Sequence, residues 1–348
     1  MRVTSSIPLG DWRQVADVAK RAEATGSDVL MTSEIQHDPF VPLAFAALAT
    51  ERVELTTAIA VAFPRSHMVV ANTSWDLQKN SGGRFVLGLG SQVRGHNVRR
   101  FSVPWSAPVP RLREYVQALR AIWRCWERKE PLKFEGDHYQ FTLMTPEFAP
   151  EPTGLPPIPV AISAVGPAML KMAGRICDGV RLHGFCTRRY VEEVALPRVF
   201  EGLEQAGRDR STFDVWGGGF AATAPDEAGL AKMMDWIRYR IGFYGSTPAY
   251  ADVLRLHGWD ELHEELHTMS RTGKWNEMAS RVSDDVVRTF AAVATYDGIG
   301  AAVKERFGGL VDGNGVMFPA DAPDGVQREV NQALRELPTP FEGHPTDW

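Results

Sequence analysis

The sequence predicts an α/β protein, a (β/α)8 TIM barrel with a mostly helical insertion between strands seven and eight. Three observations support this fold class. Short apolar segments rich in β-branched residues alternate with longer amphipathic segments, the pattern of repeated βα units with parallel strands. Eight apolar segments occur, the number that closes a barrel. An additional segment at residues 226–303 separates the last two apolar segments. The whole chain, residues 1–348, is expected to form one domain.

The expected strands follow the N-terminal one in regular order. The run at residues 53–63 is apolar and β-branched, and it is too short for a membrane span, so it predicts a strand buried on both faces. Strands two to eight are expected at residues 28–34, 53–63, 85–90, 159–166, 179–185, 213–223 and 312–319.

The expected helices lie between these strands. Asp11 is a suitable N-cap for the first helix and Gly26 a suitable stop, while Gly82 and Gly83 end another. Outside the insertion, helices are expected at residues 11–26, from residue 42, and at 67–83, 110–126, 167–178, 188–207 and 326–337.

Composition excludes several function classes. The chain has 348 residues and a net charge of −5, which gives no support for a nucleic-acid or membrane-surface partner. The N-terminus has no apolar leader, and no apolar run reaches transmembrane length. Cys125, Cys177 and Cys186 share no metal or redox spacing, so reduced thiols and a cytoplasmic location are expected.

The stretch "SGGRFVLGLGSQVRGHNVRR" combines glycines, a short strand and basic residues. Gly88 and Gly90 within the strand are expected to let a ligand approach the backbone closely. The polar residues that follow would lie at the carboxyl end of strand four, the barrel face that carries chemistry; they are Ser91, Gln92, Arg94 and His96.

Six segments in order resemble the bacterial luciferase-like monooxygenase superfamily, and within it the branch that uses the deazaflavin coenzyme F420. Residues 1–220 carry the resemblance, and the C-terminal third matches more loosely. The segments are "TSEIQHDPF", "TTAIAVAFPR", "SGGRFVLGLGSQ", "REYVQALRAIW", "FEGDHYQF" and "PPIPVAISAVGPAMLKMAGRICDGV".

The resemblance implies a homodimeric barrel with the F420 ring across its carboxyl-terminal mouth. It implies a non-proline cis peptide at Ala58–Ile59, on a bulged strand three that also carries Val61. Phosphate would be held where the helix after strand five begins. The implied cofactor-binding residues are Glu34, Ala58, Ile59, Val61, Ser91, Gln92, Arg94, His96, Ala164, Val165, Gly166 and His183.

The chain departs from the family's sugar-phosphate dehydrogenases at two positions. Their base and acid positions are Ile35 and Val93 here, so that chemistry is not supported. The nearest titratable replacements are His37 and Asp38, as proton donor or substrate contact. Alternatively, Asp38 before Pro39 is only a turn former. Glu34, Arg94 and His96 also fit plain solvated positions.

Two further motifs lie in the insertion. "HEELH", residues 263–267, matches a zinc-protease pattern, but its helix also reads as amphipathic and no third ligand is evident, so no metal is expected. "YRIGFYGSTPAY", residues 239–250, is either a substrate lid above the ring or ordinary packing between helices.

The sequence therefore favours an F420-dependent oxidoreductase that transfers hydride between the deazaflavin C5 and a carbonyl, alcohol or activated alkene of a small molecule. One alternative is an FMN-dependent monooxygenase on the same barrel. A second is a catalytically silent family member that only binds the cofactor, suggested by the loss of both dehydrogenase residues.

Overall fold

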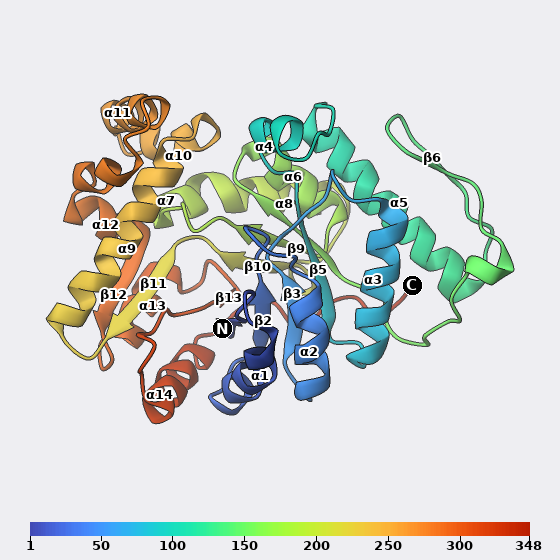
Figure 1. The fold of residues 1–348 in the computed structure, drawn as a ribbon, viewed down its shortest axis with the longest axis horizontal. Helices are drawn as coiled ribbons and strands as arrows, with labels where there is room; N and C mark the ends of the chain where they lie inside the picture. Colours follow the sequence, from blue (N-terminus) through green and yellow to red (C-terminus); the bar gives the residue numbers. More distant parts are fainter.

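Eight parallel strands close on themselves in a computed structural model that describes all residues 1–348 (Figure 1). The barrel closes where β1 pairs with β13 through Arg2 and Gly313. This confirms the predicted (β/α)8 fold class. The barrel strands are β1 (Arg2–Ser6), β2 (Val29–Thr32), β3 (Glu54–Thr57) continued by β4 (Ala60–Val61), β5 (Phe85–Gly90), β8 (Val160–Ala164), β9 (Gly179–Leu182), β10 (Asp214–Gly217) and β13 (Gly313–Asn314).

Helices surround the strands, and one continuous apolar core fills the space between them. The predicted helix at residues 188–207 runs through Pro197 as α7, a π-helical turn at Val191–Ala195, and α8. The helices outside the insertion are α1 (Val15–Ala24), α2 (Val41–Ala49), α3 (His67–Asn80), α4 (Arg94–Arg99), α5 (Pro108–Arg128), α6 (Pro167–Ile176), α7 (Arg188–Tyr190), α8 (Leu196–Gln205), α13 (Ile299–Phe307) and α14 (Asp324–Arg335).

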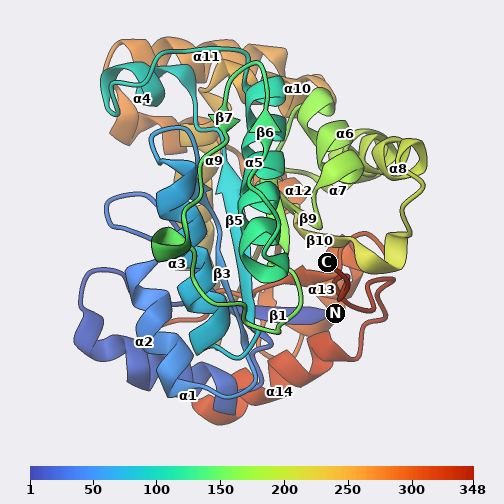
Figure 2. The same cartoon turned by 90° about the vertical axis from the view of Figure 1, so that its right-hand side faces the viewer.

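The carboxyl ends of the strands point toward α4, α10 (Ala251–Arg255) and α11 (Asp260–Arg271), as the β5 arrow shows (Figure 2). This end is called the mouth below, and the opposite end the floor. A short hairpin of β6 (Phe134–Glu135) and β7 (Gln140–Phe141) extends beside α5. No helix has the combined length and apolar character needed to cross a membrane.

Strand seven differs from the single strand predicted at residues 213–223. Gly217, Gly218 and Gly219 all have positive φ, and they break it into β10 and β11 (Phe220–Ala224). A side chain at Gly217 would lie 2.4 Å from the carbonyl oxygen of Leu182, so only glycine fits there. β11 pairs with none of the eight barrel strands, although a parallel bridge joins Ala222 to Met317, beyond the end of β13.

β11 pairs in parallel with β12 (Ala291–Thr295), which residue patterns had not indicated. The inserted segment is therefore mostly helical but returns as a strand. Its helices are α9 (Glu227–Gly245), α10 (Ala251–Arg255), α11 (Asp260–Arg271) and α12 (Asp284–Phe290).

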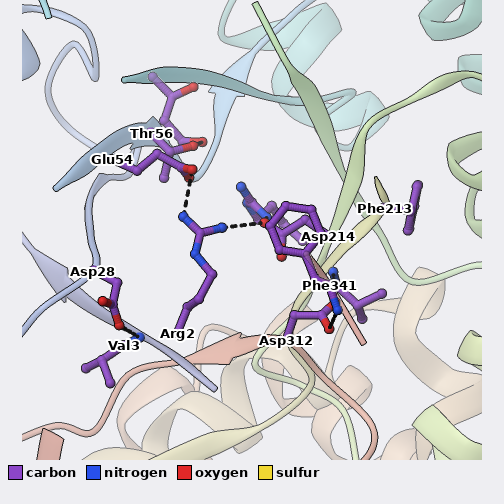
Figure 3. A network of polar contacts seen from close by, with 12 residues as sticks. Arg2, Val3, Asp28, Glu54, Thr56, Phe213, Asp214, Asp312 and Phe341 are labelled. Atoms are coloured by element: carbon purple, nitrogen blue, oxygen red, sulfur yellow. Dashed lines mark hydrogen bonds and ion pairs between the residues drawn. The ribbon is translucent and has the colours of Figure 1, made fainter. Parts of the chain in front are cut away.

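A network of buried and half-buried charges crosses the floor (Figure 3). Arg2 contacts Glu54 at 2.7 Å and Asp214 at 3.5 Å, and Asp214 contacts Arg181 at 2.9 Å. Asp214 is fully buried, and both arginines lie over the ring of Trp216. Two positive and two negative charges thus join β1, β3, β9 and β10 in one network.

We expect Asp214→Leu to lower the free energy of unfolding by about 3–5 kcal/mol, because it leaves the buried guanidinium of Arg181 without its carboxylate. The double variant Arg181→Met/Asp214→Leu should lose less, since no isolated charge remains between these two positions. Chemical denaturation measures both.

The exposed pair Lys129–Glu151 supplies the control, and Glu151→Gln should change stability by at most about 1 kcal/mol. A double variant that is no more stable than Asp214→Leu would contradict this account of the floor.

Candidate active site

The carboxylate of Glu34 is fixed at the end of β2. Its Oε2 accepts hydrogen bonds from the N–H of Val61 at 2.7 Å and from Nη1 of Arg65 at 2.6 Å. Nη2 of Arg65 lies 3.2 Å from Oδ2 of Asp38. Arg65 therefore holds the ends of strands two and three together beside the mouth.

His37 and Asp38 differ in how strongly the structure holds them. Oδ1 of Asp38 accepts hydrogen bonds from the N–H groups of Phe40 and Val41, the first free donors of α2. His37 is exposed, and its Nε2 faces Gly10 in the loop after β1. Both lie at the mouth, but Asp38 holds the start of α2, whereas the exposed side chain of His37 forms no hydrogen bond within the protein.

Strand three is bulged as the family resemblance predicted, and the Ala58–Ile59 peptide is cis. The glycines of β5 serve this bulge rather than a ligand, which corrects the expectation for them. A Cβ at Gly88 would lie 1.8 Å from the carbonyl oxygen of Thr57. One at Gly90 would lie 2.7 Å from the Ile59 side chain. The space beside both glycines is occupied by strand three.

The loop after β5 is held by a residue that sequence reasoning missed. The side-chain amide of Asn97 donates to the carbonyl oxygens of Ser91, Gln92 and Val93, at 2.9, 3.3 and 3.2 Å. Gln92 has a φ of 56°, and its Oε1 accepts from the N–H of Val93. The only sequence signal for Asn97 is an asparagine in an otherwise basic segment, and its burial is visible only in the structure.

The α4 edge of the mouth is basic. Arg94, His96, Arg99 and Arg100 are all exposed, and none forms an ion pair with an acidic side chain. Nη2 of Arg100 donates to the carbonyl oxygen of Ile35 at 2.8 Å, which joins this edge to the loop after β2. The edge can receive a negatively charged group without displacing an internal partner.

The β8 end has an open helix N-terminus. Gly166 precedes α6, no side chain caps that helix, and no atom lies within 4 Å of the place a Cβ would occupy at Gly166. Ala164 is buried beneath it. The hydroxyl of Tyr190, another residue missed in the sequence, donates to the carbonyl oxygen of Val165 at 3.0 Å. Backbone N–H groups at such a terminus suit a phosphate.

His183 lies at the β9 end in a defined protonation state. Its Nδ1 accepts a hydrogen bond from the N–H of Phe185 at 2.9 Å, so Nε2 carries the proton in the neutral ring. The ring stacks on Tyr250 and meets the edge of Tyr244. Burial, assisted by the positive charge of Arg240, lowers the pKa of His183 to about 4. At neutral pH this imidazole is a hydrogen-bond donor and not a cation.

These contacts place part of the segment at residues 239–250 over the β9 end, a position that fits both the lid and the packing interpretations. The zinc-like motif has a packing role. Nδ1 of His263 contacts the carbonyl oxygen of Gly245 at 2.7 Å, and Nδ1 of His267 contacts that of Ser246 at 2.9 Å. No group of three or more His, Cys, Asp or Glu side chains is arranged to hold a metal ion.

Known proteins share this architecture. The model of the luciferase-like monooxygenase family matches residues 1–313. An uncharacterized protein of Mycobacterium tuberculosis is 45% identical over 97% of this chain and 98% of its own length. The F420-dependent glucose-6-phosphate dehydrogenase of Intrasporangium calvum is 32% identical and covers 58% of this chain and 63% of its own.

Among solved structures, the coenzyme F420-dependent tetrahydromethanopterin reductase of Methanopyrus kandleri superposes with a TM-score of 0.74. It is 20% identical and covers 97% of this chain and 98% of its own. The bulged third strand, the closed barrel and the match over residues 1–313 lead to one conclusion: the chain belongs to the luciferase-like monooxygenase family.

Proposed function

We propose that this oxidoreductase is F420-dependent and transfers hydride to or from a carbonyl, alcohol or activated alkene of a small molecule. The observation that carries the proposal is the unpaired basic edge formed by Arg94, His96, Arg99 and Arg100 beside the bulged strand. F420 bears a phosphate and an acidic tail, which match an edge of this charge. The 32% identity to an F420-dependent dehydrogenase supports the same cofactor.

The residues at the mouth fit such a group. Ala58, Ile59 and Val61 form the bulge against which a planar ring can lie, and Glu34 fixes that bulge. The open N-terminus of α6 after Gly166 suits a phosphate, with Ser91 and Gln92 on the other side of β8. When bound, the deazaflavin supplies two-electron hydride chemistry.

The proposal gives His183 and His37 different roles, a hydrogen-bond donor and a proton donor. His183 donates from Nε2 to an oxygen of the bound ring or substrate, because its other nitrogen is engaged by the backbone. With a pKa of about 4, it is a poor proton source at neutral pH. His37 is exposed at the mouth and would supply the proton for the alkoxide or enolate that is left when hydride is added to the carbon of a carbonyl or an activated alkene.

The cofactor is tested by titrating the purified protein with F420 and with FMN. We expect F420 to bind about 10-fold more tightly or better, since additional charge-assisted contacts are available to its acidic tail. Arg94→Gln should weaken F420 binding, while Lys20→Gln on the outer face of α1 should not. Tighter binding of FMN, or FMN retained on the purified protein, would refute the F420 assignment.

The proton donor is tested in His37→Ala. Loss of a positioned acid typically costs about 10²–10⁴ in rate, so we expect kcat to fall at least about 10²-fold with F420 affinity nearly unchanged. His183→Ala is the comparison and should weaken cofactor binding instead. Wild-type kcat in His37→Ala would transfer the role to Asp38, His183 or water.

We further propose a homodimer formed through the outer face of α2. Phe45 and Leu48 are exposed there, Leu48 at 80%, with Trp12 packed against Phe45 and Val69 exposed on the neighbouring α3. A contiguous apolar surface of this kind is typical of an interface. A second copy would offer the same apolar face, as twofold symmetry requires.

Leu48→Glu should convert the dimer to a monomer in light scattering while leaving the circular dichroism spectrum unchanged, because a charge would be buried at the interface. Leu143→Glu, on the exposed loop after β7, is the matched control and should remain dimeric. A wild-type monomer at micromolar concentration would contradict the proposed assembly.

A further inference from the structure

One face of α9 turns a stripe of side chains toward His183. Trp236, Arg240 and Tyr244 are spaced four residues apart and so lie along one side of the helix. The guanidinium of Arg240 lies over the Trp236 ring at 4.9 Å, and the edge of Tyr244 meets His183 at 4.3 Å between ring centroids. Figure 1 shows α9 rising toward α10 and α11 at the mouth.

The stripe is also fixed to the barrel at its lower end. The Trp236 ring meets Phe220 edge-on at 6.0 Å. The Phe220 ring in turn lies against Gly184, where a Cβ would come within 2.9 Å of it. His183 therefore meets one end of the stripe directly, and Gly184 is linked to the other end through Phe220; Arg240 lies between these ends along the helix.

Arg240 has no acidic partner, unlike the arginine two positions before it. Arg238 contacts both Asp235 and Asp284 on another side of the helix. Arg240 is only partly exposed, and its guanidinium forms a cation–π contact with the Trp236 ring. The positive charge of Arg240 also helps to lower the pKa of His183. Two hydrogen-bond donors, one of them charged, thus face the mouth with no carboxylate between them.

Exposed aromatic rings lie on α9 and beside it. Trp236, Phe243 and Trp275 are each about two-fifths exposed, at 42%, 39% and 42%, and the rings of Phe243 and Trp275 lie 5.8 Å apart. Large rings exposed together beside an unpaired guanidinium provide an apolar surface with one anion-binding point.

We infer that the substrate is an aromatic or extended apolar compound bearing a carboxylate. Its carboxylate binds Arg240, and its apolar body lies against Trp236 and Phe243, while His183 stays with the cofactor. This inference rests on the proposed function, because it assigns this wall of the mouth to the substrate and leaves the α4 edge to the cofactor.

The test uses 3-phenylpropionate and 3-phenylpropanol, which differ in charge but share the ring and chain, in calorimetric titrations of the full-length protein. The wild type should bind the acid at least about 10-fold more tightly than the alcohol. Arg240→Gln should abolish this preference, because it weakens the binding of the acid and not that of the alcohol. Arg240→Lys should retain part of the preference. Lys232→Gln, which removes an exposed positive charge two turns away, should change neither.

Trp236→Ala provides a second variant. It should weaken the binding of the acid and of the alcohol to a similar extent, because the Trp236 ring contacts both probes. Equal binding of the two probes by the wild type, or an unchanged preference in Arg240→Gln with a native circular dichroism spectrum, would overturn the inference.

A third arm repeats the titration with F420 present. Binding of 3-phenylpropionate should persist, and displacement by F420 would assign Arg240 to the cofactor and overturn the substrate assignment. If F420 does not bind at all, the proposed function fails, yet the preference for the acid and its loss in Arg240→Gln still test the carboxylate site separately.

Discussion

The approach of the Thr57 carbonyl to Gly88 is the contact on which the mouth of the barrel depends. No residue with a side chain fits at position 88, because its Cβ would overlap that oxygen. This close contact lets strand three leave its line after Thr57 and resume as β4, where the N–H of Val61 meets Glu34. Arg65 then binds Glu34 and Asp38 together. One glycine thus positions the ends of two strands and the loop between strand two and α2.

Arginine has opposite consequences at the two ends of the barrel. At the floor, Arg2 pairs with Glu54 and Asp214, and Arg181 pairs with Asp214, so every charge has a counter-charge and the loss of one partner is costly. At the mouth, the arginines of the α4 edge and Arg240 have none. The unpaired charges are stable only because water or a ligand reaches them. Unlike Arg65, which pairs with Glu34 and Asp38, these arginines at the mouth therefore remain available to a ligand.

The sequence was sufficient for the order of strands and helices because each βα unit carries its own periodicity and its own stop signals. It was insufficient where a distant residue decides the local shape. The break at Gly217–Gly219 arises because the backbone there approaches Leu182 and Arg306, which lie far away in the chain. Likewise, β12 is a strand because β11 lies beside it.

The same distinction applies to the candidate site. Residues that follow strands, such as Glu34 and His183, could be assigned to the mouth from their position alone. Their states could not, since the tautomer of His183 depends on the Phe185 N–H and its low pKa on burial beneath the inserted segment. The clamping roles of Asn97 and Tyr190 depend on carbonyl groups whose orientation no residue pattern encodes.

The pairing of β11 with β12 has a consequence for how this protein family can diversify. The chain departs for α9 and returns from α12 through two neighbouring strands, so both ends of the excursion are held about 5 Å apart by the backbone itself. The paired strands β11 and β12 therefore keep the same position relative to the eight barrel strands, whatever the length or composition of the segment between them. The segment between β11 and β12 can therefore be lengthened, shortened or replaced while the barrel beneath it keeps its shape.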